Sequence, residues 1–137
     1  MNGFLIDTSV MLDVAEDDPT WADWSQRQLD VASSQGPVAI NPIIYAECSL
    51  AYVDVEQFDS VLGRLSLAVL EIPRQALFLA ARQFRAYRRQ GGVRTGVLPD
   101  FFIGAHAAVA QLTLITRDLR RRAWFPTVRI IAPAAAP

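Results

Sequence analysis

The 137-residue chain contains no lysine, because all 13 of its basic residues are arginine. This absence excludes several chemistries. A P-loop nucleotidase requires a lysine on its phosphates, Schiff-base catalysis requires a lysine amine, and receiver domains pair clustered acids with a lysine. A GC-rich genome also favours arginine, so the bias alone indicates no function. The 14 acids give a net charge of −1, so no overall charge attracts nucleic acid.

Cys48 and His106 are the only cysteine and the only histidine. A single cysteine forms no intrachain disulfide and is compatible with a reducing compartment. Because no Cys–His arrangement is visible, we interpret Cys48 as a small buried residue and not as a nucleophile. A lone histidine argues against ribonuclease chemistry built on two histidines. We interpret His106 as a histidine whose polar atoms are satisfied within an apolar helix.

Long hydrophobic runs are missing as well. No stretch of about 18 uninterrupted apolar residues predicts a membrane span. The N-terminus lacks the basic region of a signal peptide, and Asp7 interrupts the first apolar run. We therefore expect a cytoplasmic protein with no membrane partner. Hydrophobic residues still make up 52% of the chain, so we expect part of this surface to face a second copy or another protein.

Short apolar runs alternate with longer helical patterns along the chain. This alternation predicts an α/β fold built from βαβ units, with a parallel sheet flanked by helices on both faces. Pro42, Pro73 and Pro99 stand where helices should begin. We predict one domain over residues 1–133 and a short C-terminal tail over 134–137. The expected strands are 3–6, 38–40, 67–72, 113–116 and 128–131, and the expected helices lie near 8–16, 20–35, 42–52, 55–65, 73–90 and 99–111.

Four acidic residues stand beside these apolar segments. Asp7 and Asp118 follow predicted strands, Asp100 begins a predicted helix, and Glu47 lies inside one. In a parallel sheet all four places fall at the C-terminal edge of the strands, so the carboxylates can converge. Each also has an ordinary explanation: a helix cap, a favourable helix dipole or a turn. Glu47 fits these least, because its sequence neighbours are apolar and a charge in apolar surroundings needs a partner.

Four converging carboxylates would repel one another, and a bound cation is the natural remedy. An all-oxygen ligand set favours Mg²⁺ or Mn²⁺ over zinc or copper. The chemistry that this implies is phosphodiester hydrolysis by metal-activated water. We interpret Glu71 as an edge-strand or strand-end residue and not as a ligand. The remaining acids are interpreted as a solvated face: Asp13, Glu16, Asp17, Asp18, Asp23, Asp30, Asp54, Glu56 and Asp59.

The segments FLIDTSVML, NPIIYAE, LPDFFIGAHA and LITRD, in this order and spacing, resemble those of the PIN-domain ribonucleases, above all the VapC toxins of bacterial VapBC toxin–antitoxin modules. The resemblance covers nearly the whole chain. It implies a five-stranded parallel sheet and Mg²⁺- or Mn²⁺-dependent endoribonuclease activity that leaves 5′-phosphate and 3′-hydroxyl ends. It also implies a homodimer that a VapB antitoxin holds inactive.

The resemblance also assigns residues. The acidic quartet falls on Asp7, Glu47, Asp100 and Asp118, as metal ligands and catalytic residues. Asp118 occupies the position that is least uniform in the family, so its direct ligation of the metal stays open. Supporting hydroxyls fall on Thr8, Ser9 and Thr116.

Binding of RNA beside an acidic site requires basic contacts. Arg82, Arg85 and Arg89 share one face of the helix over 73–90, with Arg88 and Arg94 nearby. We predict RNA contacts for one set of arginines, and solvated faces or ion pairs are the alternative: Arg85, Arg89, Arg117, Arg120, Arg121 and Arg122. Phosphate contacts would make affinity fall steeply with salt. In the helix over 20–35, Trp21 and Trp24 are predicted to form a groove for an antitoxin helix. The alternative is that both rings pack in the core.

Two other function classes stay open. A non-catalytic PIN-like module that binds RNA or protein would have the same fold. A phosphatase of the haloacid-dehalogenase type would need Asp-x-Asp after the first strand, where this chain has Asp7-Thr8-Ser9.

Overall fold

The computed structural model describes residues 2–94 and 96–134, with Arg121 described in its backbone only. A five-stranded sheet lies at the centre, in the order β3-β2-β1-β4-β5, and all of its pairings are parallel. The strands are β1 (Phe4–Ile6), β2 (Val38–Ile40), β3 (Leu67–Val69), β4 (Thr113–Ile115) and β5 (Ile130–Ile131). The predicted α/β fold with five parallel strands is therefore confirmed.

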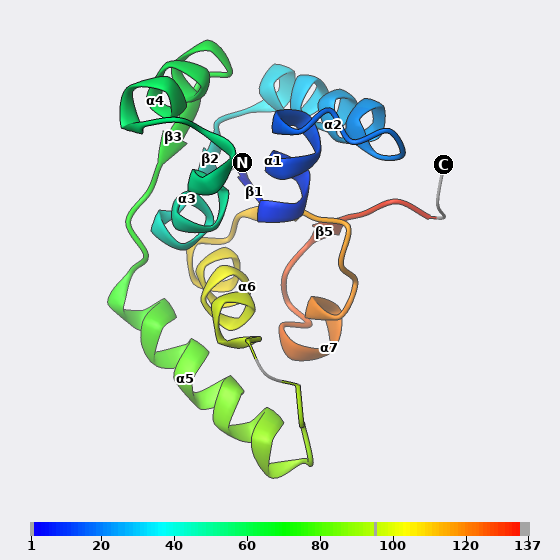
Figure 1. Cartoon of the computed structure of the whole chain (residues 1–137). Helices are drawn as coiled ribbons and strands as arrows, with labels where there is room; N and C mark the ends of the chain where they lie inside the picture. The colour runs from blue at the N-terminus through cyan, green and yellow to red at the C-terminus, as the bar shows by residue number, and fades with distance from the viewer. Residues whose placement is uncertain (1, 95, 135–137) are drawn as a thin grey trace.

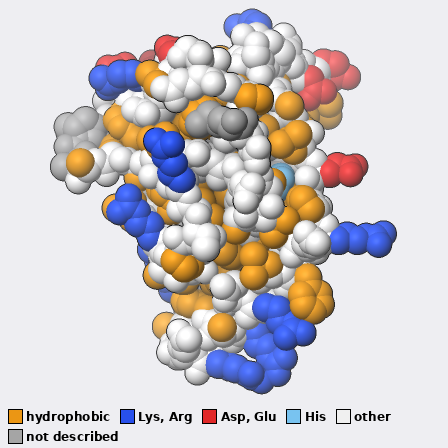
Figure 2. All heavy atoms as spheres, turned by 180° about the vertical axis from the view of Figure 1, so that it is seen from behind, with side chains coloured by type: hydrophobic (Ala, Val, Ile, Leu, Met, Phe, Trp, Pro, Cys, Tyr) orange, Lys and Arg blue, Asp and Glu red, His pale blue; other side chains and the backbone are white. Residues whose placement is uncertain are grey.

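Helices connect the strands and cover the sheet (Figure 1). They are α1 (Thr8–Ala15), α2 (Ala22–Gln35), α3 (Pro42–Cys48), α4 (Val55–Arg64), α5 (Arg74–Arg89), α6 (Leu98–Ala110) and α7 (Arg121–Trp124), with a 3₁₀ turn, η1 (Ser49–Ala51). The helix α5 extends away from the sheet along one side of the molecule (Figure 1). In the view from behind, arginine side chains gather at that lower end (Figure 2).

Some predicted boundaries are wrong in ways that local contacts explain. The helix expected over 42–52 starts where Asn41 caps it, with Asn41 Oδ1 accepting from the Ile44 amide at 2.9 Å. It then ends at Cys48 and passes into η1, before Asp54 caps α4 through the Gln57 amide at 2.8 Å. The strands expected over 67–72 and 128–131 are shorter, and the four-residue α7 was not predicted at all.

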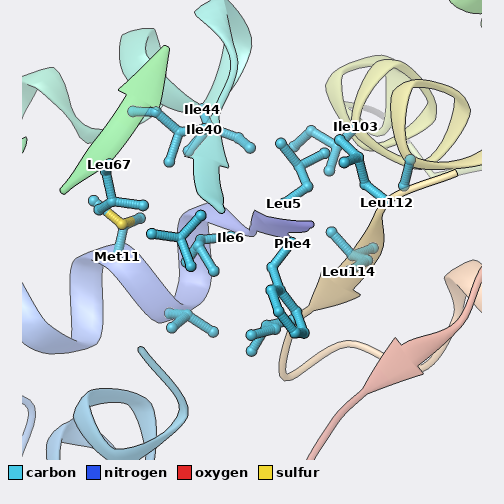
Figure 3. Close-up of a cluster of buried hydrophobic side chains, with 14 of the residues drawn as sticks. Phe4, Leu5, Ile6, Met11, Ile40, Ile44, Leu67, Ile103, Leu112 and Leu114 are labelled. Atoms are coloured by element: carbon cyan, nitrogen blue, oxygen red, sulfur yellow. The ribbon is translucent and has the colours of Figure 1, made fainter. Parts of the chain in front are cut away.

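Side chains of β1 alternate between two apolar layers, as the two-residue period of a strand requires. Phe4, Leu5 and Ile6 are at most 1% exposed. Leu5 lies on the side of Ile103 from α6, whereas Ile6 lies on the opposite side with Met11 from α1 (Figure 3). Helices therefore bury both faces of the central strand, which explains why its sequence is continuously apolar.

An aromatic cluster joins α5, α6 and α7 and fixes the start of α6. Phe101 is fully buried and stacks on Trp124, with ring centroids 4.3 Å apart, while Tyr87 of α5 packs against both rings. A Cβ at Gly104 would lie 2.4 Å from the Phe125 ring, so only glycine permits this approach. Phe102 is half-buried and packs against the core, and Val97 at the N-cap is buried, so Phe101 is the fully buried member of the Phe pair.

His106 is buried in α6 and bonded to Asn41, with Asn41 Nδ2 lying 3.2 Å from His106 Nδ1. Since the Asn41 Oδ1 atom already accepts from a backbone amide, its amide nitrogen donates to the ring and Nδ1 is the acceptor. The interpretation of His106 as a satisfied histidine in an apolar helix is confirmed. Burial lowers the pKa of this imidazole below its ordinary 6.5.

This burial gives the fold a defined pH dependence. Because the pKa of His106 is lower in the folded state than in the unfolded chain, stability is fully present above about pH 6.5 and is lost as the pH falls below it. The expected effect is a fall in the free energy of unfolding as the pH is lowered through about 6.5. Urea unfolding in EDTA between pH 7.5 and 5.5 measures it. His106→Gln should flatten the profile, and an unchanged profile in that variant would contradict the assignment.

Cys48 is 1% exposed, and burial, with a smaller contribution from Glu47, raises the pKa of its thiol to about 12. The interpretation as a small buried residue is confirmed. We expect native protein to react with a thiol reagent such as DTNB at least about a hundredfold more slowly than denatured protein at pH 8, because thiolate and access are both lacking. Rapid labelling of folded protein would contradict this environment.

Several large apolar side chains remain on the surface. Leu50, Val53 and Val93 are 98%, 87% and 82% exposed, and Figure 2 shows apolar side chains over much of the rear face. The expectation that a second copy or another protein covers part of this surface stays a prediction. In the described residues, no helix is both long enough and apolar enough to cross a membrane.

Candidate metal and active site

A pocket of about 440 Å³ opens at the C-terminal ends of β1 and β4. Seven of its eleven lining residues are acidic, and we call it the acidic pocket. Its acidic residues are Asp7, Asp13, Glu16, Asp18, Glu47, Asp100 and Asp118. All four carboxylates singled out from the sequence therefore line one pocket, as the sheet-edge reasoning predicted.

Asp7 is the most deeply placed of the four, at 3% exposure. It occupies the N-cap position of α1, yet its side chain makes no capping hydrogen bond among the described residues. Its Oδ2 instead accepts from Thr116 Oγ1 at 2.6 Å and from Ser9 Oγ at 3.1 Å. Helix capping therefore does not explain this acid, and two hydroxyls fix its orientation.

Thr116 links two of the acidic positions. Its fully buried hydroxyl donates to Asp7 and accepts from the Asp118 amide at 3.0 Å. Thr8 contributes in the same way from α1, donating through Oγ1 to Glu47 Oε1 at 2.6 Å. Each of the three predicted supporting hydroxyls, including that of Ser9, thus contacts the carboxylate or backbone of a pocket residue.

Glu47 is exposed, which corrects its assignment to apolar surroundings. The side chains of Ile44 and Cys48, on the opposite side of α3, enter the core, while Glu47 faces the pocket. Successive helical residues point about 100° apart, so apolar neighbours in sequence do not imply burial. Glu71, which was not expected to be a ligand, is exposed and lies outside the pocket lining.

Asp100 and Asp118 are each 23% exposed, and Arg120 lies between them. Asp100 stands in the first turn of α6, where the helix dipole favours its charge. Arg120 Nε donates to both oxygens of Asp118, at 2.9 and 2.8 Å, and its Nη2 also pairs with Asp118. The same Nη2 is 4.0 Å from Asp100 Oδ2. A guanidinium thus supplies positive charge inside the carboxylate set.

Asp13 is 3% exposed, so its assignment to a solvated face is wrong. Arg117 donates to it through two nitrogens, at 2.8 and 2.9 Å, and Ser25 Oγ donates at 2.7 Å. The Arg117 guanidinium also lies over the Trp21 ring, 4.9 Å from its centroid. This bidentate pair joins α1 and α2 to the loop after β4, directly beside Thr116.

The model of one protein family matches residues 4–124 of this chain, and its description is "PIN domain". The chain belongs to the PIN domain family. The match extends from β1 to α7, so it includes the whole acidic pocket. Among curated protein sequences, none matches the chain.

Solved structures with the same fold cover nearly all of this PIN domain. Three similar ones are VapBC2 from Rickettsia felis bound to a DNA fragment from its promoter, DNA-bound VapBC from Salmonella typhimurium, and a toxin–antitoxin complex from Klebsiella pneumoniae. Their sequence identities are 17%, 23% and 22%, and their TM-scores 0.73, 0.71 and 0.65. They cover 95–96% of this chain, and the aligned region is 98% of each of theirs. At these identities the similarity shows the fold.

The donors of the PIN domain's pocket suit Mg²⁺ or Mn²⁺ in kind, because they are carboxylate oxygens and hydroxyl-supported acids. The carboxylates of the pocket are nevertheless spaced too widely for three of them to contact one ion as they stand. Across residues 2–94 and 96–134, no three Asp, Glu, His or Cys side chains are close enough to hold one metal ion. A metal ion held by three of these carboxylates would need the side chains to move closer together, and Asp118 would have to loosen its pair with Arg120.

The predicted RNA-binding arginines of the PIN domain divide into three groups. Arg117 and Arg120 line or border the acidic pocket but are engaged by Asp13 and Asp118. Arg122 is exposed, and the side chain of Arg121 lies outside the described part of the structure. Arg85 and Arg89 line a separate hollow on α5 that shares no residue with the acidic pocket.

Two further pocket residues of the PIN domain, Glu16 and Asp18, belong to the acids predicted to form a solvated face. Glu16 lines the pocket from the end of α1, and Asp18 Oδ1 accepts from the Thr20 and Trp21 amides at 2.9 Å, which shapes the turn into α2. The sequence does contain a pattern that places Asp13 and Glu16 at the pocket. Ser9, Asp13 and Glu16 recur every three or four residues, so they share one face of α1.

Proposed function

We propose that this PIN domain is a Mg²⁺- or Mn²⁺-dependent endoribonuclease and the toxin of a toxin–antitoxin pair. One observation carries the proposal: Asp7, Glu47, Asp100 and Asp118, from four separate segments, line one pocket at the edge of a parallel sheet. Carboxylates on rigid elements around an open pocket are a suitable cradle for a divalent ion that meets phosphate. The structural neighbours are VapBC and toxin–antitoxin complexes, which supports the toxin role.

The chain's own residues would prepare the site in defined ways. Asp7, Glu47, Asp100 and Asp118 would hold the metal. A bound divalent ion supplies Lewis acidity toward water and toward the scissile phosphate. Thr116 and Ser9 fix the Asp7 carboxylate, and Thr8 holds Glu47 through the same kind of hydrogen bond. Preorientation of this kind limits the reorganisation that metal and RNA binding require.

We propose a VapB-like antitoxin as the protein partner and a homodimer as the assembled form. We propose the cytoplasm as the location, where the toxin would meet both its RNA substrate and its antitoxin. A groove of about 320 Å³ supports the first part. It is lined mostly by apolar side chains of α1, α2 and α4, among them Met11, Leu29 and Val61. An amphipathic helix of a partner would bury its apolar face in such a groove. Trp21 and Trp24 do not line it; their rings pack edge to face, 6.2 Å apart.

The test is cleavage of structured RNAs by purified protein free of antitoxin, with Mg²⁺ or Mn²⁺ and analysis of the new ends. We expect 5′-phosphate and 3′-hydroxyl ends and no product in EDTA. Cyclic 2′,3′-phosphate ends would indicate a different chemistry. RNA binding and metal binding without cleavage of any RNA would favour the non-catalytic PIN-like module.

Arg120→Ala should tighten metal binding. Removal of the guanidinium takes one partner from the Asp118 carboxylate and removes a positive charge that repels the incoming cation. We expect the Kd for Mn²⁺, measured by isothermal titration calorimetry without RNA, to fall about tenfold, which corresponds to about 1.4 kcal/mol. Arg122→Ala, an exposed arginine nearby, is the control and should change the Kd less than about twofold. Weaker Mn²⁺ binding in Arg120→Ala would contradict the competing role of Arg120.

A further inference from the structure

The outer face of α5 carries a run of exposed positive charge. The helix contains five arginines and no acid, in a chain whose net charge is −1. Arg74, Phe78, Arg82, Arg85 and Arg89 are exposed and recur every three or four residues, which places them along one side of the helix. We call these five residues the α5 track. Figure 2 shows the arginines gathered at the lower end of the molecule, over this helix.

The track is separate from the acidic pocket and its charge is not neutralised within the described chain. Arg82, Arg85 and Arg89 line a hollow of about 320 Å³, which shares no lining residue with the acidic pocket. Among the described residues, the ion pairs involve Arg117 and Arg120, and no carboxylate pairs with an arginine of the track. Positive charge without an internal partner attracts an anionic one.

An aromatic side chain interrupts the arginines of the track. Phe78 is 64% exposed, and the Arg82 guanidinium lies over its ring at 4.7 Å from the centroid. The core does not need this ring, because α5 packs through its other side, where Ala76 and Ala80 are fully buried. A flat aromatic ring beside a flat guanidinium is a surface on which an unpaired nucleobase stacks.

We propose that the α5 track binds single-stranded RNA outside the acidic pocket, with its arginines on phosphates and a base stacked at Phe78. This inference rests on the proposed function, because it assigns the same RNA a second place of contact. A second copy that docked through the same face would set arginine against arginine, which charge repulsion disfavours. Insertion of α5 into a membrane would require its apolar side, which is buried against α6.

The test measures RNA binding without cleavage. Full-length protein carrying Asp7→Asn, in EDTA, is titrated into a fluorescein-labelled oligouridylate of about 16 nucleotides, the upper end of common strand-binding site sizes. The triple variant Arg82→Gln/Arg85→Gln/Arg89→Gln is compared with Arg27→Gln/Arg64→Gln/Arg129→Gln. Both remove three exposed arginines and change the net charge equally, so only the position of the lost charge differs.

We expect the α5 variant to bind about tenfold or more weakly near 50 mM salt, and its slope of log K against log salt to fall by about 2, since each lost phosphate contact of a single strand contributes about 0.7. The control variant should change affinity less than about threefold at this salt. Phe78→Ala should weaken binding about fivefold or more without a change of slope, as loss of a stacked base requires.

Equal weakening by the two triple variants, no weakening by the α5 variant, or no binding of the oligonucleotide by the parent protein would overturn the proposal. So would loss of binding to phosphatidylserine vesicles with unchanged binding to RNA, which would make the track a membrane contact. Failure of the proposed nuclease function would give a different result from failure of the α5 track. RNA bound through α5 but never cut with metal would remove the nuclease and keep the track, whereas unchanged binding beside normal cleavage would remove the track alone.

Discussion

Asp7→Asn is expected to lower the rate of metal-dependent RNA cleavage by about a thousandfold or more, equivalent to about 4 kcal/mol of lost transition-state stabilisation. Asp7 is the most deeply buried of the four proposed metal ligands, and two hydroxyls orient its Oδ2 atom. The amide keeps the size of the side chain and removes the charge that would hold a cation. Cleavage of end-labelled RNA under single-turnover conditions, with Mn²⁺ in excess, gives the rate.

The fold should survive this change. In EDTA the Asp7→Asn variant should unfold at the same urea concentration as the parent or at a higher one, because a buried charge among other carboxylates has been removed. Asp30→Asn is the matched control: it is the same substitution at an exposed acid of α2, outside the pocket. It should cleave at the parental rate. Loss of cleavage in both variants, or retention in both, would contradict the assignment of Asp7.

Arg117→Met is expected to destabilise the fold by about 3 kcal/mol, the largest stability effect that we predict. It leaves the Asp13 carboxylate, 3% exposed, without its bidentate partner, and the loss of one member of a buried ion pair strands the other charge. The cation contact with Trp21 is lost as well. Equilibrium urea unfolding, followed by tryptophan fluorescence and by circular dichroism, measures the change.

A double variant separates the stranded charge from the lost packing. Asp13→Asn/Arg117→Met contains no buried charge at this position, and the Ser25 hydroxyl can still donate to residue 13. It should recover at least about half of the lost stability. Arg122→Met, at an exposed site, should cost less than about 0.5 kcal/mol. A double variant no more stable than Arg117→Met would show that packing, and not charge, sets the effect.

The sheet and the acidic pocket could be predicted because both depend on short-range patterns. Apolar runs of three residues, separated by helices with proline or Asx starts, specify a parallel sheet. Once the strands are placed, their C-terminal ends share an edge, and the acids at those ends must share it too. The positions of Asp7 after β1 and Asp118 after β4 follow from this topology without any knowledge of side-chain contacts. The position of Asp100 follows because α6 precedes β4 and begins at the same edge.

The partners of the charged residues could not be predicted in this way. Asp13 and Arg117 are 104 positions apart, and no local pattern shows that the loop after β4 returns to α1. Arg120 lies only two residues from Asp118, yet its reach toward Asp100 depends on the turn that leads into α7. Glu47 shows the reverse error, because it has apolar neighbours in sequence but faces solvent, on a helix in which Ile44 and Cys48 are the buried residues.

The measurement that tests the central claim most directly is the rate of RNA cleavage by the purified full chain as the concentration of free Mn²⁺ is varied from none, in EDTA, to saturation. If the acidic pocket carries the chemistry, the rate is zero in EDTA, rises with Mn²⁺ to a plateau, and is shifted to lower Mn²⁺ by Arg120→Ala. Cleavage that continues at the same rate in EDTA, or in the Asp7→Asn variant, would contradict a metal-dependent site at these carboxylates.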